Sequence, residues 1–189
     1  MARPRAYDPD TAVQAAMQVF WQKGFVATSM ADIYAATGLK PGNLYATFTD
    51  KETLFRRAFE TYAEQFRATL PTHSRGIAAI TDWLDVQAGL ASDDPDRKGC
   101  LIVNTLSERE AHGPETRALA DARLAEIHAF FLGALGDARR AGELPASVSL
   151  AGAADFLTGT VLGLMTLGRA RAPAAMIRNM ANAAKQALR

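Results

Sequence analysis

Apolar residues recur at helical spacing near the start of the chain. They stand at positions 13, 16, 17 and 20, which places them on one face of a helix. Asp8 can cap the first turn, and Pro9 fits that turn because its missing N–H group costs nothing there. Gly24 is a typical residue for a helix end. The pattern predicts an amphipathic helix over residues 9–22.

Two shorter helical stretches follow. Ser29 and Asp32 have the spacing of a capping box, which predicts a short helix to about position 36. Gly38 interrupts the pattern, and Pro41 lies at the first turn of a second short helix that ends near position 46. These two stretches are therefore predicted to be helices joined by a glycine-containing turn.

A long amphipathic helix is predicted next, from the segment 49–52 to about Thr69. Its start has two candidate caps, either Thr49 with Glu52 as a capping box or Asp50 alone. The rest of the pattern is helical too, with a loop over 92–96. Its predicted helices cover residues 77–91, 100–111, 114–141, 147–167 or 149–167, and 173–188. No strand pattern is evident, so the fold class is all-α, with about nine helices.

Composition narrows the class of protein. Of 189 residues, 49% are hydrophobic and 22% are charged, as in soluble globular proteins. The uncharged run 156–168 is shorter than the ~20 residues that cross a membrane, and no apolar signal segment follows Met1. A cytoplasmic protein without a membrane partner is expected. Cys100 is the single cysteine, so neither an intrachain disulfide nor a cysteine-based zinc site is expected; no metal and no cofactor are predicted.

Charge is uneven along the chain although its net value is only +1. Residues 1–68 carry 8 basic and 7 acidic side chains, residues 69–155 carry 8 and 13, and residues 156–189 carry 5 and none. This balance excludes a uniformly basic nucleic-acid binder. It leaves room for a compact DNA-reading unit with a few placed cations.

The segment from Thr28 to Phe48 has the pattern of a helix-turn-helix motif. Gly38 suits the left-handed backbone position that such a turn needs, because a Cβ atom is penalised there. Leu39 and Leu44 are expected to fill the space between the two helices. In this motif the second helix lies in the major groove and presents its N-terminal residues to base edges.

A longer set of residues resembles the DNA-binding domain of TetR/AcrR-family transcriptional regulators. The resemblance covers residues 8–60. It rests on Gly24-Phe25, Thr28-Ser29, Ile33, Thr37-Gly38-Leu39, Gly42-Asn43-Leu44-Tyr45, Phe48 and Asp50-Lys51-Glu52-Thr53-Leu54. The resemblance implies a three-helix DNA-binding domain over residues 1–52 and a helical effector-binding and dimerisation domain over residues 53–189. It also implies a homodimer on a pseudo-palindromic double-stranded DNA operator, released by a small-molecule effector of unknown identity.

The resemblance implies roles for several residues of the motif. Thr28, Tyr45 and Lys51 are expected to contact phosphates. The expected base-reading positions are Lys40, Gly42, Asn43 and Thr47. Arg3 and Arg5 are predicted to reach a minor groove or phosphates. The chain departs from the family pattern at Tyr34, Lys40 and Thr47, so no operator sequence is implied.

The C-terminal two-thirds resembles the family only in helical content and length. The candidate effector-pocket residues are Trp83, Gln87, Cys100, Asn104, His128, Phe131, Phe156 and Met165, a set that suits an apolar or aromatic ligand. The candidate dimer-interface residues are Gly159, Gly163, Ile177, Met180 and Ala184. Cys100 has two interpretations, either a small buried hydrophobe or a thiol whose pKa is lowered by Lys98 and a helix start, as in an electrophile sensor.

Other function classes have less support. The sequence contains no His-Glu-x-x-His, Gly-x-Ser-x-Gly or phosphate-loop motif, so no enzyme is predicted. A helical adaptor that uses the helix-turn-helix to contact protein is the alternative. The grouping of Lys40, Asn43, Tyr45 and Lys51 on one surface argues against it. The resemblance favours a repressor, and a transcriptional activator is a further alternative.

Overall fold

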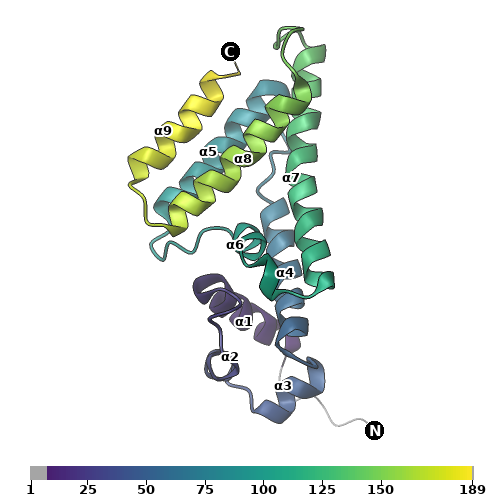
Figure 1. The fold of residues 1–189 in the computed structure, drawn as a ribbon, viewed down its shortest axis with the longest axis vertical. Coiled ribbons are helices and arrows are strands. Elements are labelled where there is room, and N and C mark those ends of the chain that lie inside the picture. The colour runs from purple at the N-terminus through teal and green to yellow at the C-terminus, as the bar shows by residue number, and fades with distance from the viewer. Residues whose placement is uncertain (1–7, 189) are drawn as a thin grey trace.

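The computed structural model describes residues 8–188, which form an elongated molecule built from helices (Figure 1). Within that part of the chain there are nine α-helices, one short 3₁₀ helix and no strand, as the all-α prediction requires. The helices are α1 Pro9–Lys23, α2 Met30–Thr37, α3 Pro41–Thr47, α4 Lys51–Arg67, α5 Gly76–Asp93, α6 Leu101–Ser107, α7 Pro114–Arg140, α8 Leu150–Arg169 and α9 Ala174–Gln186.

Side-chain caps fix the starts of α1, α2 and α4, as the sequence predicted. Asp8 accepts a hydrogen bond from the Asp10 N–H group at 3.1 Å at the start of α1. Ser29 and Asp32 form both bonds of a capping box at the start of α2. Asp50, rather than Thr49, caps α4 by accepting from the Thr53 N–H group at 2.7 Å. These caps satisfy N–H groups that would otherwise have no partner.

Two helix boundaries differ from the sequence prediction. The helix α5 continues to Asp93, so the predicted loop over 92–96 starts later. The helix predicted over 100–111 is shorter, because α6 ends at Ser107 and a 3₁₀ turn over Arg109–Ala111 follows. The N–H group of Ala111 bonds to the carbonyl of Glu108, which tightens the chain into that turn.

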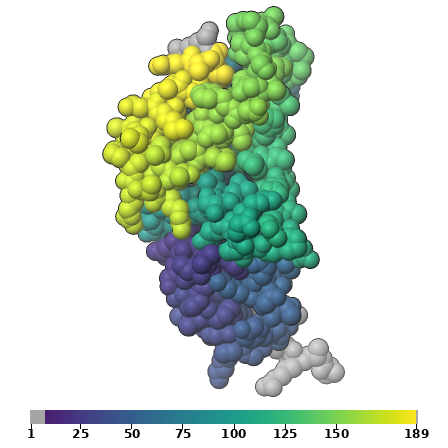
Figure 2. All heavy atoms as spheres, in the orientation of Figure 1, coloured from purple at the N-terminus to yellow at the C-terminus, as the bar shows by residue number. Residues whose placement is uncertain are grey.

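The molecule has two regions that share one hydrophobic core. We call α1–α3 with the first turns of α4 the head, and α5, α7, α8 and α9 the bundle. Phe20, Ile33 and Phe55 are almost fully buried in the head, as are Trp83 and Phe131 in the bundle. The helix α4 leaves the head and runs beside α7 (Figure 1). The surface view shows the two regions meeting without a gap, with the α6–α7 segment between them (Figure 2).

The helix α8 is longer than the uncharged run 156–168. By length and composition alone, Leu150–Arg169 is sufficient to cross a membrane. The helix packs against α5, α7 and α9. These contacts place α8 in the helical bundle, with 39% of its most apolar 18-residue window buried within the chain.

The predicted dimer face on α9 is wrong at two positions. Ile177 and Ala184 are 0% and 1% exposed, because the apolar side of α9 is turned inward onto α5 and α8 of the same chain. Met180 is also engaged within the chain, since a Cβ atom at Gly163 would lie 2.7 Å from its Cε atom. Gly159 is exposed, and a Cβ atom there would meet nothing within 4 Å.

Candidate nucleic-acid interface

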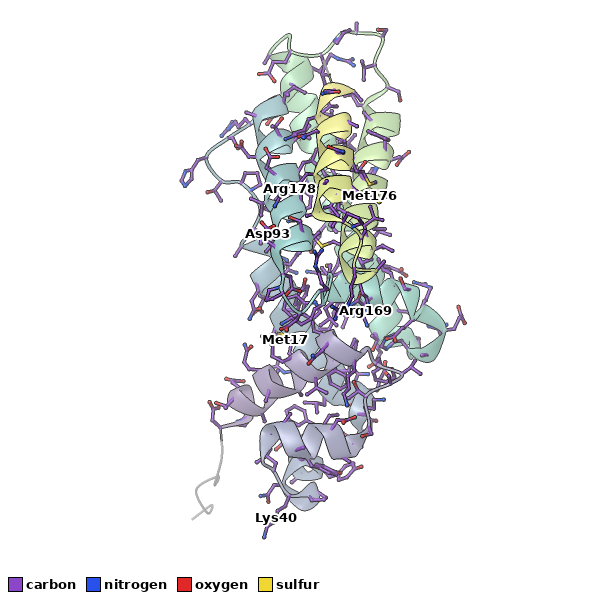
Figure 3. All side chains as sticks on the ribbon, turned by 90° about the vertical axis from the view of Figure 1, so that its left-hand side faces the viewer. Met17, Lys40, Asp93, Arg169, Met176 and Arg178 are labelled. Carbon is purple, nitrogen blue, oxygen red and sulfur yellow. The ribbon has the colours of Figure 1, made fainter. Side chains whose placement is uncertain are left out.

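The helix α3 lies at the end of the molecule farthest from the bundle (Figure 1). Leu44 is buried and attaches the helix to the head core. Lys40, which precedes the helix, projects at the tip of the head (Figure 3). Gly42 and Asn43 are exposed and Thr47 is partly buried. The four predicted base-reading positions therefore lie at one end of the molecule, on or directly before one short helix.

The fold constrains two glycines of the motif differently. Gly38 ends α2 with φ = 67°, a left-handed conformation that disfavours any side chain. Gly42 has no such constraint, and a Cβ atom there would meet nothing within 4 Å. The fold therefore requires a glycine at position 38 but not at position 42.

Tyr45 is 49% exposed, so its ring does not belong to the core of the head. A hydrogen bond with Tyr45 raises the pKa of the Tyr34 hydroxyl above its usual value of 10. The residue that departs from the family pattern at position 34 thus interacts with one of the predicted phosphate contacts.

Lys51 begins α4 next to the motif. Its Nζ atom lies 4.3 Å from the centroid of the Phe25 ring, a cation–π contact. Partial burial lowers the pKa of Lys51, and the charges of Glu108 and Glu52 act in the opposite direction. This lysine is thus a half-buried group, seated on the Phe25 ring at a helix N-terminus, where the helix dipole favours anions.

Thr28 does not expose its side chain, contrary to the prediction that it contacts a phosphate. It is 2% exposed, and its hydroxyl donates to the Gly24 carbonyl at 2.6 Å. Ser29, the next residue, provides the cap of α2. The predicted arm residues Arg3 and Arg5 lie outside the described residues.

The head is attached to the rest of the molecule by polar contacts that the sequence analysis missed. The N–H group of Phe25 donates to Oε2 of Glu108 at 2.7 Å. Trp21 donates through Nε1 to the Gly99 carbonyl at 2.8 Å. Nη1 of Arg169 donates to the Trp21 carbonyl at 3.1 Å. We call these contacts the junction.

A second set of contacts at the junction surrounds His112. Its ring lies 4.4 Å from the Phe25 ring and 4.7 Å from the Phe55 ring, with no exposed side-chain surface. Glu52 Oε1 is 3.5 Å from Nδ1, and it accepts hydrogen bonds from the Gly113 N–H group and the Thr116 hydroxyl. Neither ring nitrogen of His112 makes a hydrogen bond with the described residues. Lost solvation of the charged ring lowers the pKa of His112.

The structure does not bring the eight predicted pocket residues together. Trp83, Gln87, Phe131 and Met165 are buried in the bundle. The prediction is wrong for Phe156, which is 51% exposed. His128 is also on the surface, where Nε2 lies 3.0 Å from Oδ1 of Asp155. The remaining two, Cys100 and Asn104, are buried at α6.

Cys100 is 1% exposed at the start of α6. Burial raises the pKa of its thiol, and a hydrogen bond with Tyr62 only partly offsets that effect. Of the two interpretations, burial therefore favours the small buried hydrophobe over a thiol whose pKa is lowered by Arg97, Lys98 and the helix start.

The fold and the tip of the head define a helix-turn-helix DNA-binding protein. The family model of the bacterial regulatory proteins of the tetR family matches residues 12–58, and the model of the tetracyclin repressor-like C-terminal domain matches residues 76–184. The chain belongs to the TetR family and is a DNA-binding transcriptional regulator.

Individual relatives agree with this assignment. The HTH-type transcriptional repressor ComR of Escherichia coli (strain K12) is 30% identical over 172 residues, which is 88% of this chain and 82% of that protein. A cysteine mutant of the TetR family transcriptional regulator CifR, complexed with 26bp double-strand operator DNA, is similar over 100% of both chains, with a TM-score of 0.84 and 29% identity. A TetR transcriptional regulator from Chloroflexus aurantiacus J-10-FL has a TM-score of 0.84 and 27% identity, covering 94% of this chain and 91% of that one.

Proposed function

We propose that this protein is a homodimeric repressor that reads a pseudo-palindromic operator and leaves it when a small molecule binds the effector domain. The observation that carries the proposal is the exposed polar side of α3 at the tip of the head. The repressor name of the ComR relative and the operator complex of the CifR relative support it. The proposed site of action is the cytoplasm, and the proposed activity is regulatory rather than enzymatic.

The proposed readout divides between base edges and phosphates. Lys40 suits the acceptor atoms of guanine, and Asn43 suits the paired donor and acceptor of adenine. Thr47 adds a hydroxyl on the same helix. Because the fold does not require a glycine at position 42, we assign Gly42 to close approach of the backbone to DNA. Tyr45 and Lys51 are assigned to phosphates, with Lys51 reinforced by the N-terminus of α4.

A second copy of the chain is the proposed partner of the bundle. Leu132 on α7, Phe156 on α8 and Met176 on α9 are 40%, 51% and 52% exposed. Exposed large apolar side chains on neighbouring helices are typical of a protein interface. Gly159, one helical turn beyond Phe156, permits close approach of another helix. A dimer would place two heads on half-sites ~34–36 Å apart or a multiple of that distance.

The proposed effector pocket keeps the buried members of the predicted set. Gln87 donates through Nε2 to the Thr69 hydroxyl at 3.3 Å, and Trp83 donates to the same hydroxyl at 3.2 Å. The Oε1 atom of Gln87 is buried and has no hydrogen-bond partner among the described residues. Leaving an acceptor in that state costs roughly 1–3 kcal/mol, which a ligand with a hydrogen-bond donor would recover. Phe131 provides an aromatic wall beside Trp83.

The experiment that tests the proposal is fluorescence anisotropy of the purified protein with its own upstream intergenic DNA, beside scrambled DNA, across a salt series. Tight, sequence-selective binding that weakens steeply with salt is expected. Equal, weak binding to both duplexes would be followed by selection from random DNA. Failure to select any sequence would exclude the repressor and revive the adaptor alternative.

A further inference from the structure

A hollow of about 290 Å³ lies between α6 and the last turn of α8. Val103 and Ala170 contribute apolar walls, and Ser107 lies at the exposed side of α6. Asn104 and Thr166 add polar groups, and two charged residues, Glu108 and Arg169, complete the lining. This hollow is separate from the aromatic core around Trp83. Its volume suits a small molecule of about one ring.

Arg169 brings to the hollow a positive charge that has no acidic partner at salt-bridge distance. Its Nη1 atom donates to the carbonyls of Trp21 and Lys98, at 3.1 and 3.0 Å. Among residues 8–188 no carboxylate lies within 4.0 Å of this guanidinium, although ten ion pairs of other lysines and arginines occur there. A partly buried cation held only by neutral carbonyls favours an anionic partner, and a guanidinium has five N–H donors to offer it.

Glu108 brings the opposite charge to the same lining, but its carboxylate is directed to the head. Its Oε2 atom accepts from the Phe25 N–H group at 2.7 Å. Its Oε1 atom lies only 2.5 Å from the place where a Cβ atom of Gly24 would stand. The carboxylate is therefore seated on the backbone that connects α1 to α2. Of the two charged side chains of the lining, Arg169 is the one that can attract an anion.

The two charged residues that line the hollow also take part in the contacts of the junction. Glu108 contacts the head at Phe25, and Arg169 contacts it at Trp21. Arg169 lies at the end of α8 next to the head (Figure 3). An anion that takes up the N–H groups of Nη1 competes with the Trp21 carbonyl for them. Binding in the hollow would thus weaken one of the contacts that position the head.

We propose that this hollow is a second ligand site, for a small monocarboxylate with an apolar body, and that its occupation loosens the head by drawing Arg169 away from α1. The carboxylate would bind the guanidinium through charged hydrogen bonds, and the apolar body would lie against Val103 and Ala170. The effect on DNA rests on the proposed function. Coupling requires only that the ligand bind the loosened arrangement better than the tight one.

Direct binding is measured first, without DNA. The probe is 4-fluorobenzoate, observed by ¹⁹F NMR with the full-length protein, and benzamide serves as the uncharged competitor. Saturable binding is expected, with displacement by benzoate and not by benzamide. Ser107→Phe places a ring in the hollow while leaving Glu108 and Arg169 themselves unchanged, and it should weaken binding at least about tenfold, as should Arg169→Gln. Arg171→Gln, an exposed control two residues away, should leave binding unchanged.

The effect on DNA is measured second, by anisotropy at constant ionic strength, because DNA affinity depends on salt. Benzoate is expected to weaken operator binding several-fold in the original protein and not in Ser107→Phe. Absence of operator binding without any probe would defeat the proposed function alone, since the NMR measurement still decides the site. No saturable 4-fluorobenzoate binding, or equal binding by Ser107→Phe and the original protein, would overturn the site. Binding with no change in operator affinity would overturn the coupling.

Discussion

The head and the bundle expose different kinds of side chain. The tip of the head presents Lys40 and Asn43 on a short helix whose own core contact is Leu44. The bundle exposes large apolar side chains such as Phe156 and Met176. A polar surface with placed cations suits a charged nucleic acid, whereas an apolar surface suits another protein chain. The difference teaches that one chain can present two kinds of surface in two regions, which contact each other at the junction.

The largest effect is expected from removing a core aromatic in either region. Phe20 is fully buried in the head and packs edge-on to Phe55 at 5.0 Å, and Trp83 is fully buried in the bundle. Phe20→Ala and Trp83→Ala should each lower the free energy of unfolding by about 3–5 kcal/mol. Urea denaturation followed by circular dichroism measures both.

The shape of that transition decides how separate the two regions are. Because one continuous core runs through head and bundle, each variant should still unfold in a single transition. An early, separate transition in Phe20→Ala, with the bundle still folded, would show that the head unfolds on its own and that the junction is weak.

The sequence predicted the head better than the bundle, for a physical reason. The Ser29–Asp32 capping box and the turn at Gly38 depend on residues close in the chain, so they could be predicted from sequence alone. The inward orientation of Ile177 depends on α5, far away in the chain, and was predicted wrongly. The apolar stripe of α9 showed that one face is buried, but not whether its partner is the same chain or another.

In the candidate site too, the residues of a local motif could be predicted and the contacts between distant positions could not. The exposed polar positions of α3 lie within one local motif. By contrast, the contacts of Glu108 and Arg169 with the head join residues 83 and 148 positions apart. A single carboxylate or guanidinium in a helical pattern gives no indication of such a partner. Thr28 was misassigned because a threonine before a helix has the same pattern whether its hydroxyl faces DNA or, as here, the Gly24 carbonyl.

Within the head, two substitutions should separate base readout from phosphate contact. Asn43→Ala is expected to cost ~1–3 kcal/mol of operator binding and to relax preference at one base position. Lys51→Gln is expected to weaken binding to all sequences alike and to reduce the salt slope by about one. Anisotropy on a panel of single-base operator variants measures both. A uniform loss from Asn43→Ala would exclude its reading role.

At the junction, His112 should make stability depend on pH. Burial lowers its pKa in the folded state below the usual 6.5, so the unfolded chain binds more protons as the pH falls below that value. The contribution of this group is complete above pH 6.5 and is lost as the pH falls toward the folded-state pKa. The slope it adds is at most about 1.4 kcal/mol per pH unit.

Urea denaturation between pH 8 and pH 5 measures this dependence. The charged groups that act on the ring are Glu52 and Lys51 from α4 and Glu108 from the end of α6. His112→Phe keeps a ring between Phe25 and Phe55 and should flatten the profile over this range. An unchanged profile would mean that the ring titrates as it does in the unfolded chain.

The smallest effect is expected from an exposed ion pair of the bundle, and it sharpens the contrast between two arginines. Nη2 of Arg178 on α9 lies 2.8 Å from Oδ1 of Asp93 on α5, with both side chains more than half exposed (Figure 3). Water screens such a pair, so a double-mutant cycle with Arg178→Gln and Asp93→Asn should give a coupling of about 0.2–1 kcal/mol that falls with added salt.

Arg169 is half-buried and has no acidic partner among the described residues. Its substitution should differ from that of Arg178 in the effect on operator affinity, because Arg169→Gln removes two hydrogen bonds to backbone carbonyls at the junction. If Arg178→Gln alters operator affinity as much as Arg169→Gln does, the junction has no special part in positioning the head.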